Sequence, residues 1–249
     1  MDISKKHARI SANNVAIKDN VEKIYEAGAK SGYDRFWDNY QLNGNRLFYG
    51  GAFSGGGWHK DTFYPKYNIV SSRYSTASMF ANFNYATGYG LFDLEARLQE
   101  LGVTLDISNT NQTTHMFQNA QISVVPELDF TKVGTLQYLC QDSKIKTFRK
   151  IKVAETTTYG NNFNNCTNLT DITFEGVIGQ TGLNFNWSPL SVTSMKNIIS
   201  CLKDLSGTAG EGVYTIQFSD TCWEALEADS TAPNGNTWEN YVTSLGWIV

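Results

Sequence analysis

The chain has 249 residues, with 20 basic and 24 acidic side chains and a formal net charge of −4. This length can bury a large core, as one long domain or as two small ones. A mild negative charge without a basic patch excludes the usual electrostatic signature of nucleic-acid binding. The sequence contains no apolar stretch long enough to cross a bilayer, so we expect no membrane insertion.

Charged residues make up 18% of the chain, below the ~25% of an average soluble protein. Asn, Thr, Ser, Gly and Tyr take their place. Such a polar, uncharged surface suits hydrogen bonding to sugars or proteins, and it equally suits solubility alone. Residues 1–7 carry mixed charge and no apolar segment follows them, so no signal peptide is visible. A protein that leaves the cell by lysis fits this pattern, and so does a cytoplasmic protein.

The first predicted element is a helix that begins at Asn13 or Asn14 and ends near residues 43–45. Its apolar residues follow helical steps of three and four. In one interpretation, residues 1–44 cap the domain that follows. In the other, the helix assembles the chain into something larger through a weak heptad seam, which consists of Ile17, Val21, Ile24 and Gly28.

Residues 45–67 are rich in glycine and aromatic residues. No Lys-Ser/Thr pair closes the glycine run, so the pattern of a phosphate-binding loop fails. We interpret this segment as an irregular early turn with a flexible loop. Trp58 and His59 are candidate ligand-binding residues here, although closing the end of the core explains Trp58 more readily.

Residues 71–113 are predicted to hold further turns and an insertion. The pair Met79-Phe80 matches Met116-Phe117 in type, but the two lie 37 residues apart. Residues 82–90 are the predicted insertion, and insertions in repeat proteins often fall on the binding face. Tyr85 and Tyr89 are therefore candidate ligand-binding residues. A short helix over 91–102, stopped by a glycine, and a strand over 103–107 complete the region.

The most regular part of the sequence is 114–187. Val125, Phe148 and Ile172 are separated by 23 and 24 residues. The same spacing recurs in a second set, which consists of Ile122, Ile145 and Leu169. A fixed period in this range predicts a leucine-rich-repeat β-solenoid over residues 45–187, in which each turn buries its apolar face by stacking on its neighbours.

Cys140 and Cys166 are expected to fill matching repeat positions as small core residues stacked in a ladder. A disulfide between them is the alternative. No C-x-x-C spacing occurs and the three histidines are isolated, so we expect no metal site and no cofactor. Catalytic patterns such as G-x-S-x-G and H-E-x-x-H are also missing, and we therefore expect no enzymatic activity.

In residues 188–249 the spacing of apolar residues changes. This segment is predicted to form a C-terminal α/β cap over the open end of the solenoid. Helices are expected to begin at Ser191, at Ser219 or Asp220, and at Thr237. Strands are expected over 213–218 and 247–249.

The pattern Phe-x-Asn-Cys-x-x-Leu-x-x-Ile at residues 163–172 resembles the BspA-like leucine-rich repeat. Over roughly residues 20–249, the chain is similar to the small leucine-rich-repeat proteins encoded by phages and prophages of gut Firmicutes. One repeat departs from the pattern, because Tyr138-Leu139-Cys140 lacks the asparagine. The resemblance implies an α+β repeat with an N-terminal helix and a C-terminal cap, and it implies a place in a virion.

Three functions follow from these observations. The first is a non-enzymatic tail or fibre protein, attached to other virion proteins through its N-terminal helix, that binds a host-surface glycan or protein. The second is a purely structural decoration or adaptor subunit. The third is an enzyme that degrades cell-wall polysaccharide, which requires two carboxylates in one cleft.

If the N-terminal helix is an assembly device, the full chain will form an oligomer, for which we expect a homotrimer. The mass in solution of the full chain and of a version that lacks residues 1–31 tests this prediction. A trimer that becomes a folded monomer on truncation supports assembly. Two monomers would assign the helix to capping, or to docking on a different protein.

Overall fold

The structure, a computed structural model, describes residues 47–48, 51–58, 62–66, 68–71, 75–85 and 90–249. The chain divides after Asn43, and all described residues belong to the second unit, Gly44–Val249. The helix predicted in the first 44 residues therefore lies outside the described residues. The predicted boundary between residues 187 and 188 falls inside the second unit.

The described strands are short and pair only in parallel. They are β1 (Leu47–Phe48), β2 (Gly56–Trp58), β3 (Ile69–Ser71), β4 (Asn84–Tyr85), β5 (Phe92–Asp93), β6 (Leu105–Asp106), β7 (Ile122–Val125), β8 (Leu128–Asp129), β9 (Thr147–Val153), β10 (Asp171–Gly176), β11 (Leu183–Asn184) and β12 (Ile216–Gln217). The described helices are α3 (Leu94–Leu101), α4 (Val192–Ser200), α5 (Asp220–Asp229) and α6 (Trp238–Ser244).

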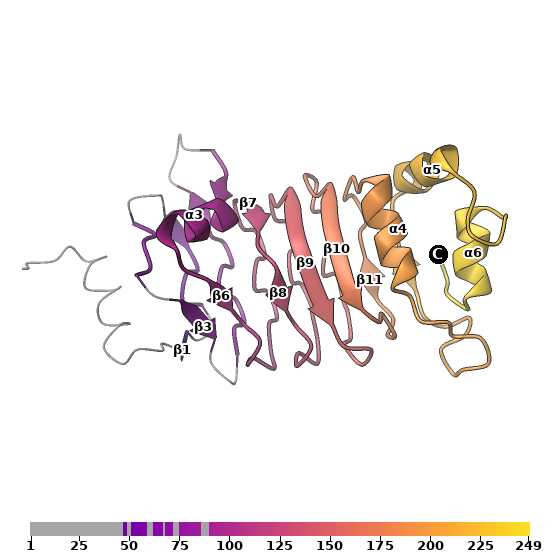
Figure 1. Ribbon diagram of the computed structural model, residues 1–249, viewed down its shortest axis with the longest axis horizontal. Helices are drawn as coiled ribbons and strands as arrows, with labels where there is room; N and C mark the ends of the chain where they lie inside the picture. The colour runs from indigo at the N-terminus through magenta and orange to yellow at the C-terminus, as the bar shows by residue number, and fades with distance from the viewer. Residues whose placement is uncertain (1–46, 49–50, 59–61, 67, 72–74, 86–89) are drawn as a thin grey trace, which may run out of the picture. The chain divides into compact units, whose positions relative to one another are not determined.

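These strands belong to four sheets. The largest has the order β10-β9-β7-β5, and β8 also pairs with β9. The smaller sheets are β1-β3-β6, β2-β4 and β11-β12. Figure 1 shows β7, β9 and β10 side by side in chain order, with α4 next to β10.

The architecture is a mixed α/β fold in which a parallel sheet curls into a half-barrel, with four helices in the described part of the chain. The predicted α+β repeat class, a leucine-rich-repeat β-solenoid with an N-terminal helix and a C-terminal α/β cap, is therefore wrong.

The physical reason is that the spacing is not constant along the chain. Val125 pairs with Phe148, and Phe148 pairs with Ile172, as the 23- and 24-residue spacing predicts. Outside this middle part, however, β3 pairs with β6 at an offset of 36 residues, and β11 pairs with β12 at an offset of 33. Helices α3 and α4 fall within these longer segments.

Several local elements agree with the sequence. The predicted helix over 91–102 is α3, where Asp93 accepts a hydrogen bond from the Ala96 amide at 2.8 Å and Gly102 ends the helix with a positive φ of 65°. Ser191 and Thr237 cap α4 and α6 with their side chains. Near the C-terminus, Ile248 lies within the expected last strand, 247–249, and forms a parallel bridge to Thr215.

The core contains stacks of phenylalanine rings from successive turns. Phe80 stacks on Phe117 at a centroid distance of 5.2 Å. Phe163 stacks on Phe185 at 4.9 Å, and Phe185 stacks on Phe218 at 5.5 Å. Because each ring covers the next, the corresponding position is buried in each of these turns.

Both central cysteines are buried and free, as the interpretation of small core residues requires. Their predicted matching positions, however, are wrong. The Cys166 thiol lies 3.6 Å from the Ser143 hydroxyl in the preceding turn, and it donates a hydrogen bond to the carbonyl of Cys140 at 2.8 Å. The 23-residue offset of these turns instead places Cys140 opposite Phe163. Burial raises the pKa of Cys166 to about 12, so its thiol stays protonated near neutral pH.

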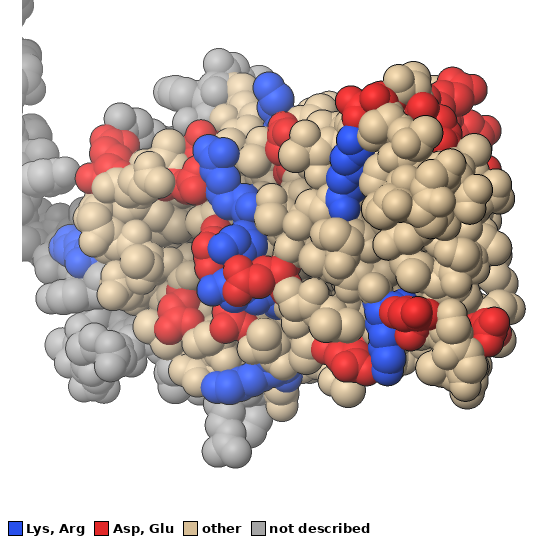
Figure 2. Space-filling view, turned by 45° about the vertical axis from the view of Figure 1, so that its right-hand side comes forward, with Lys and Arg blue, Asp and Glu red and all other residues tan. Residues whose placement is uncertain are grey.

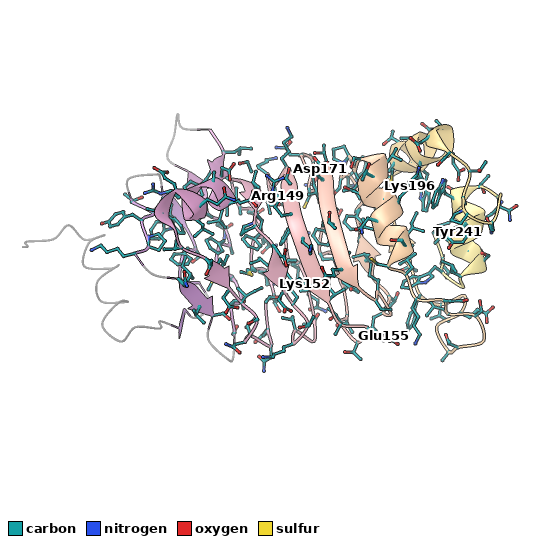
Figure 3. All side chains as sticks on the ribbon, viewed as in Figure 1. Arg149, Lys152, Glu155, Asp171, Lys196 and Tyr241 are labelled. Atoms are coloured by element: carbon teal, nitrogen blue, oxygen red, sulfur yellow. The ribbon has the colours of Figure 1, made fainter. Side chains whose placement is uncertain are left out.

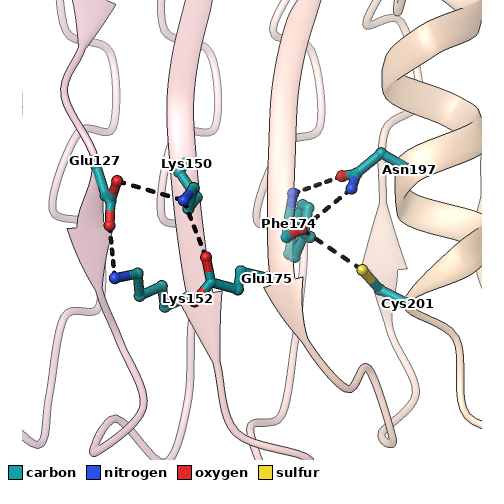
Figure 4. A network of polar contacts seen from close by, with 7 residues as sticks. All are labelled: Glu127, Lys150, Lys152, Phe174, Glu175, Asn197 and Cys201. Atoms are coloured by element: carbon teal, nitrogen blue, oxygen red, sulfur yellow. Dashed lines mark hydrogen bonds and ion pairs between the residues drawn. The ribbon is translucent and has the colours of Figure 1, made fainter.

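Helix α4 closes the open edge of β10 with side chains instead of with another strand. The Asn197 carbonyl oxygen accepts from the Phe174 amide at 2.6 Å, and its NH2 group donates to the Phe174 carbonyl at 3.2 Å (Figure 4). The Ser194 hydroxyl accepts from the Ile172 amide at 3.0 Å. These contacts satisfy backbone groups that an exposed edge strand would offer to another chain.

We predict that Asn197→Ala destabilises the protein by about 1–3 kcal/mol, because it leaves the Phe174 amide without its side-chain acceptor and the Phe174 carbonyl with only the weak thiol donor of Cys201 at 3.6 Å. The measurement is the free energy of unfolding in urea. Thr193→Ala is the matched control, since Thr193 is exposed on the same helix, and a change within about 0.5 kcal/mol is expected there. Equal effects of the two variants would contradict this role of Asn197.

Candidate functional site

The structure places Trp58 in the core. Its side chain is 8% exposed and packs against Phe53 and Phe63 at centroid distances of 5.7 and 5.9 Å. It also stacks on Phe83 at 6.3 Å. This packing supports the interpretation in which Trp58 closes the core, and it leaves little indole surface for a ligand.

Most of the other residues singled out from the sequence cannot be placed. His59 and Tyr89 lie outside the described residues, as does the seam of Ile17, Val21, Ile24 and Gly28. Tyr85 lies in β4, where its backbone pairs with Trp58 of β2. For these residues, the predicted roles in binding and assembly stay predictions.

A row of turn residues with left-handed backbone conformation runs through the described fold. Four of them are Asn or Asp, the side chains that tolerate a positive φ best: Asn82 (54°), Asn119 (55°), Asp142 (59°) and Asn165 (57°). Each of these amides donates to a carbonyl of the following turn, at 2.7 to 3.1 Å. We call these positions the left-handed row.

Trp187 is the next member of the left-handed row. It follows Asn165 by 22 residues, and the Asn165 amide donates to the carbonyl of the residue just before Trp187 at 2.8 Å. Its φ is 70°, and its side chain is 73% exposed. A bulky residue at this φ is strained, and here the strain is not offset by burial. Strain of this kind at an exposed aromatic residue points to a role in binding.

Trp187 borders a hollow of about 500 Å³ between its own turn and the start of α5. The wall combines an exposed indole, buried apolar surface and short polar side chains. The lining residues are Asn186, Trp187, Ser188, Pro189, Phe218, Ser219, Asp220 and Thr221. A mostly apolar hollow with a few polar groups is the usual composition of a small-ligand site.

The turn that carries Trp187 is held firmly from both sides. The buried Ser188 hydroxyl donates to the Phe163 carbonyl at 2.8 Å in the preceding turn. The Cys222 thiol of α5 donates to the Ser188 carbonyl at 3.3 Å. Because the backbone on the C-terminal side of Trp187 is fixed by two neighbours, the hollow is already formed and a ligand does not have to order it.

Several polar groups around the hollow are not used by the protein itself. Within the described part of the chain, no hydrogen bond or ion pair engages the Trp187 indole N–H, the Asn186 amide group or the Asp220 carboxylate. The site therefore offers the apolar face of an indole beside three polar groups, which are the indole N–H, an amide and a carboxylate.

A second hollow, of about 350 Å³, lies where β9, β10 and α4 meet. Arg149 and Asp171 line it, and both lie at the upper ends of their strands in Figure 3. The Arg149 guanidinium already binds Glu95 at 2.7 Å. No exposed aromatic ring lines this hollow in the described chain, so it is the weaker candidate.

Charged side chains on the sheet face are likewise engaged with one another. Lys150 binds Glu175 at 2.9 Å and Lys152 binds Glu127 at 2.6 Å (Figure 4). The hydrogen bond from Lys152 holds the pKa of the Glu127 carboxyl below its ordinary value. This network links neighbouring strands and leaves no free charge in its centre.

Trp187 was not singled out from the sequence, although a signal was present. The spacing of Asn119, Asp142 and Asn165 is 23 residues, and one further step falls within a residue of Trp187. A tryptophan where the pattern expects asparagine is the local departure that marks the site.

We predict that Trp187→Asn leaves the fold intact and raises its stability. Asn suits the left-handed conformation, whereas other L residues lose about 1–2 kcal/mol there. The expected increase in melting temperature is about 1–4 °C, measured by circular dichroism. A clear loss of stability would show that the exposed indole supports the fold and would weaken its assignment to binding.

Among the described residues, no helix is long and apolar enough to cross a membrane, and no cluster of side chains is suited to hold a metal ion. Comparison with known proteins gives no match to any family model, any curated protein or any solved structure. The site is therefore defined by its geometry alone.

Proposed function

We propose that this protein is a non-catalytic carbohydrate-binding protein and that the Trp187 hollow is its binding site. The observation that carries the proposal is the exposed indole in a strained turn beside unused polar groups. The apolar face of a pyranose ring packs on an aromatic ring, while its hydroxyls exchange hydrogen bonds with amide and carboxylate groups. Trp187, Asn186 and Asp220 supply these three kinds of contact.

A binding role fits the hollow better than glycoside hydrolysis. Hydrolysis needs two carboxylates that flank the bond to be broken. Asp220 is the only acidic side chain among the described residues that line the hollow. One carboxylate can orient a sugar, but it leaves the second role of the reaction unfilled.

The setting that we propose is the one inferred from the sequence, a phage tail or fibre that attaches to a host-surface glycan. The support for it is the resemblance of roughly residues 20–249 to small proteins encoded by phages and prophages, together with the polar, weakly charged composition. A purely structural virion subunit is the alternative, and it predicts no saccharide affinity at this hollow.

Saccharide binding is tested with the full chain on an oligosaccharide array, followed by titration calorimetry with the strongest ligand. Trp187→Ala is expected to weaken binding by at least about 30-fold, the effect of losing a central aromatic contact. Val213→Ala is the matched control, because Val213 is also highly exposed in the same part of the chain, at 61%, but does not line the hollow. Binding that survives Trp187→Ala would reject this site, and the absence of any saccharide ligand would reject the function.

A further inference from the structure

Charge is distributed unevenly along this chain. Residues 204–249 contain no Lys, Arg or His. Their acidic residues are Asp204, Glu211, Asp220, Glu224, Glu227, Asp229 and Glu239. The net charge of −4 for the whole chain therefore conceals a strongly acidic C-terminal part, which contains α5, one wall of the hollow.

Several of these carboxylates already have partners. Asp229 binds Lys196 at 2.5 Å, and Glu227 accepts from the backbone amide of Trp238 at 2.5 Å. On α5, Asp220 and Glu224 have no hydrogen bond or ion pair with any described residue. On the face drawn in Figure 2, one group of acidic atoms lies at the upper right, beside and beyond a column of basic atoms, and further acidic atoms lie at the lower right next to basic ones.

The basic residues nearest in sequence do not neutralise the hollow. Lys196 is occupied by Asp229 and also donates to the Ser230 hydroxyl, and it points toward α5 and α6 in Figure 3. Lys203 binds Glu155 at 2.6 Å. No basic side chain is among the described residues that line the hollow, where Asp220 is the one charged group.

We propose that the Trp187 hollow selects cationic amino sugars, with the sugar ring on the indole and its ammonium group beside the Asp220 carboxylate. This inference rests on the proposed saccharide-binding function. The ammonium gains from the carboxylate, while the sugar ring covers the indole face. Saccharides with carboxylate or phosphate groups gain nothing from Asp220 and are expected to bind more weakly.

The size of the expected preference for amino sugars follows from one charge contact at an exposed site. An ammonium and a carboxylate about 4 Å apart in water give a preference of about fivefold. Salt weakens this preference, because the Debye length falls from about 10 Å at 0.1 M to about 3 Å at 1 M salt. The stacking contact on Trp187 carries no charge, so binding of a neutral sugar changes much less with salt.

The experiment compares two ligands of equal length, the β-1,4-linked hexamer of N-acetylglucosamine and its fully de-N-acetylated form. Binding to the full chain is measured by calorimetry at pH 6, where the ligand amines carry protons. A galacturonic acid hexamer provides the anionic comparison. We expect about fivefold tighter binding of the amino form than of the acetylated form, and weaker binding of the acidic one.

Asp220→Asn is expected to abolish the preference for the amino form while it leaves the affinity for the acetylated hexamer nearly unchanged. Glu224→Gln is the matched control, since it removes the same charge from the same helix outside the hollow. Melting curves verify that both variants are folded. If the preference is missing, or persists in Asp220→Asn, or falls equally in Glu224→Gln, the inference is overturned.

The same titrations distinguish a failure of this inference from a failure of the proposed saccharide-binding function. Binding of the acetylated hexamer that depends on Trp187 but shows no preference for the amino form rejects the role of Asp220 and keeps the saccharide site. If neither glucosamine-based hexamer binds in a Trp187-dependent way, both proposals fail.

Discussion

Hydrogen bonds between successive turns hold this molecule in register, and the left-handed row shows them most clearly. Asn82, Asn119, Asp142 and Asn165 each place their amide within 2.7 to 3.1 Å of a carbonyl in the following turn. An L residue adopts this conformation only when its surroundings compensate for the strain. Here the compensation comes from the parallel strands and the stacked phenylalanine rings on the inner side of the turns.

At the edge of a sheet, backbone groups are left without a neighbouring strand and need other hydrogen-bond partners. At β10, side chains of α4 take the place of a strand, and Asn197 bonds both polar groups of Phe174. The remaining C-terminal elements attach beyond this helix, through pairs such as Lys196 with Asp229. The same arrangement brings α5 against the turn of Trp187 and creates the hollow.

The sequence predicted the middle of the fold better than its whole. The spacing of Val125, Phe148 and Ile172 is the register of the central sheet, and Gly102 ends a helix where a glycine stop was expected. The fold class was wrong because periodicity reports only which residues share a face. It does not report that the sequence offset between paired strands grows to 36 residues before the central strands and to 33 residues after them.

The candidate site was missed for a related reason. Aromatic residues in a glycine-rich segment drew attention to Trp58, yet burial depends on contacts with distant residues such as Phe83, which local sequence does not show. Trp187 departs from the Asn and Asp of its row, and only an alignment of the turns makes that departure visible.

The left-handed row also has a consequence for engineering. At these positions the backbone is fixed by the neighbouring turn, while four of the five side chains, Asn82, Asn119, Asn165 and Trp187, are exposed. A residue other than Asn or Asp costs about 1–2 kcal/mol there, but its backbone position is set by the neighbouring turn, so one edge of the protein is a set of display points. Parallel neighbours lie about 4.8 Å apart, so rings introduced at adjacent turns would form an array with a spacing set by the backbone.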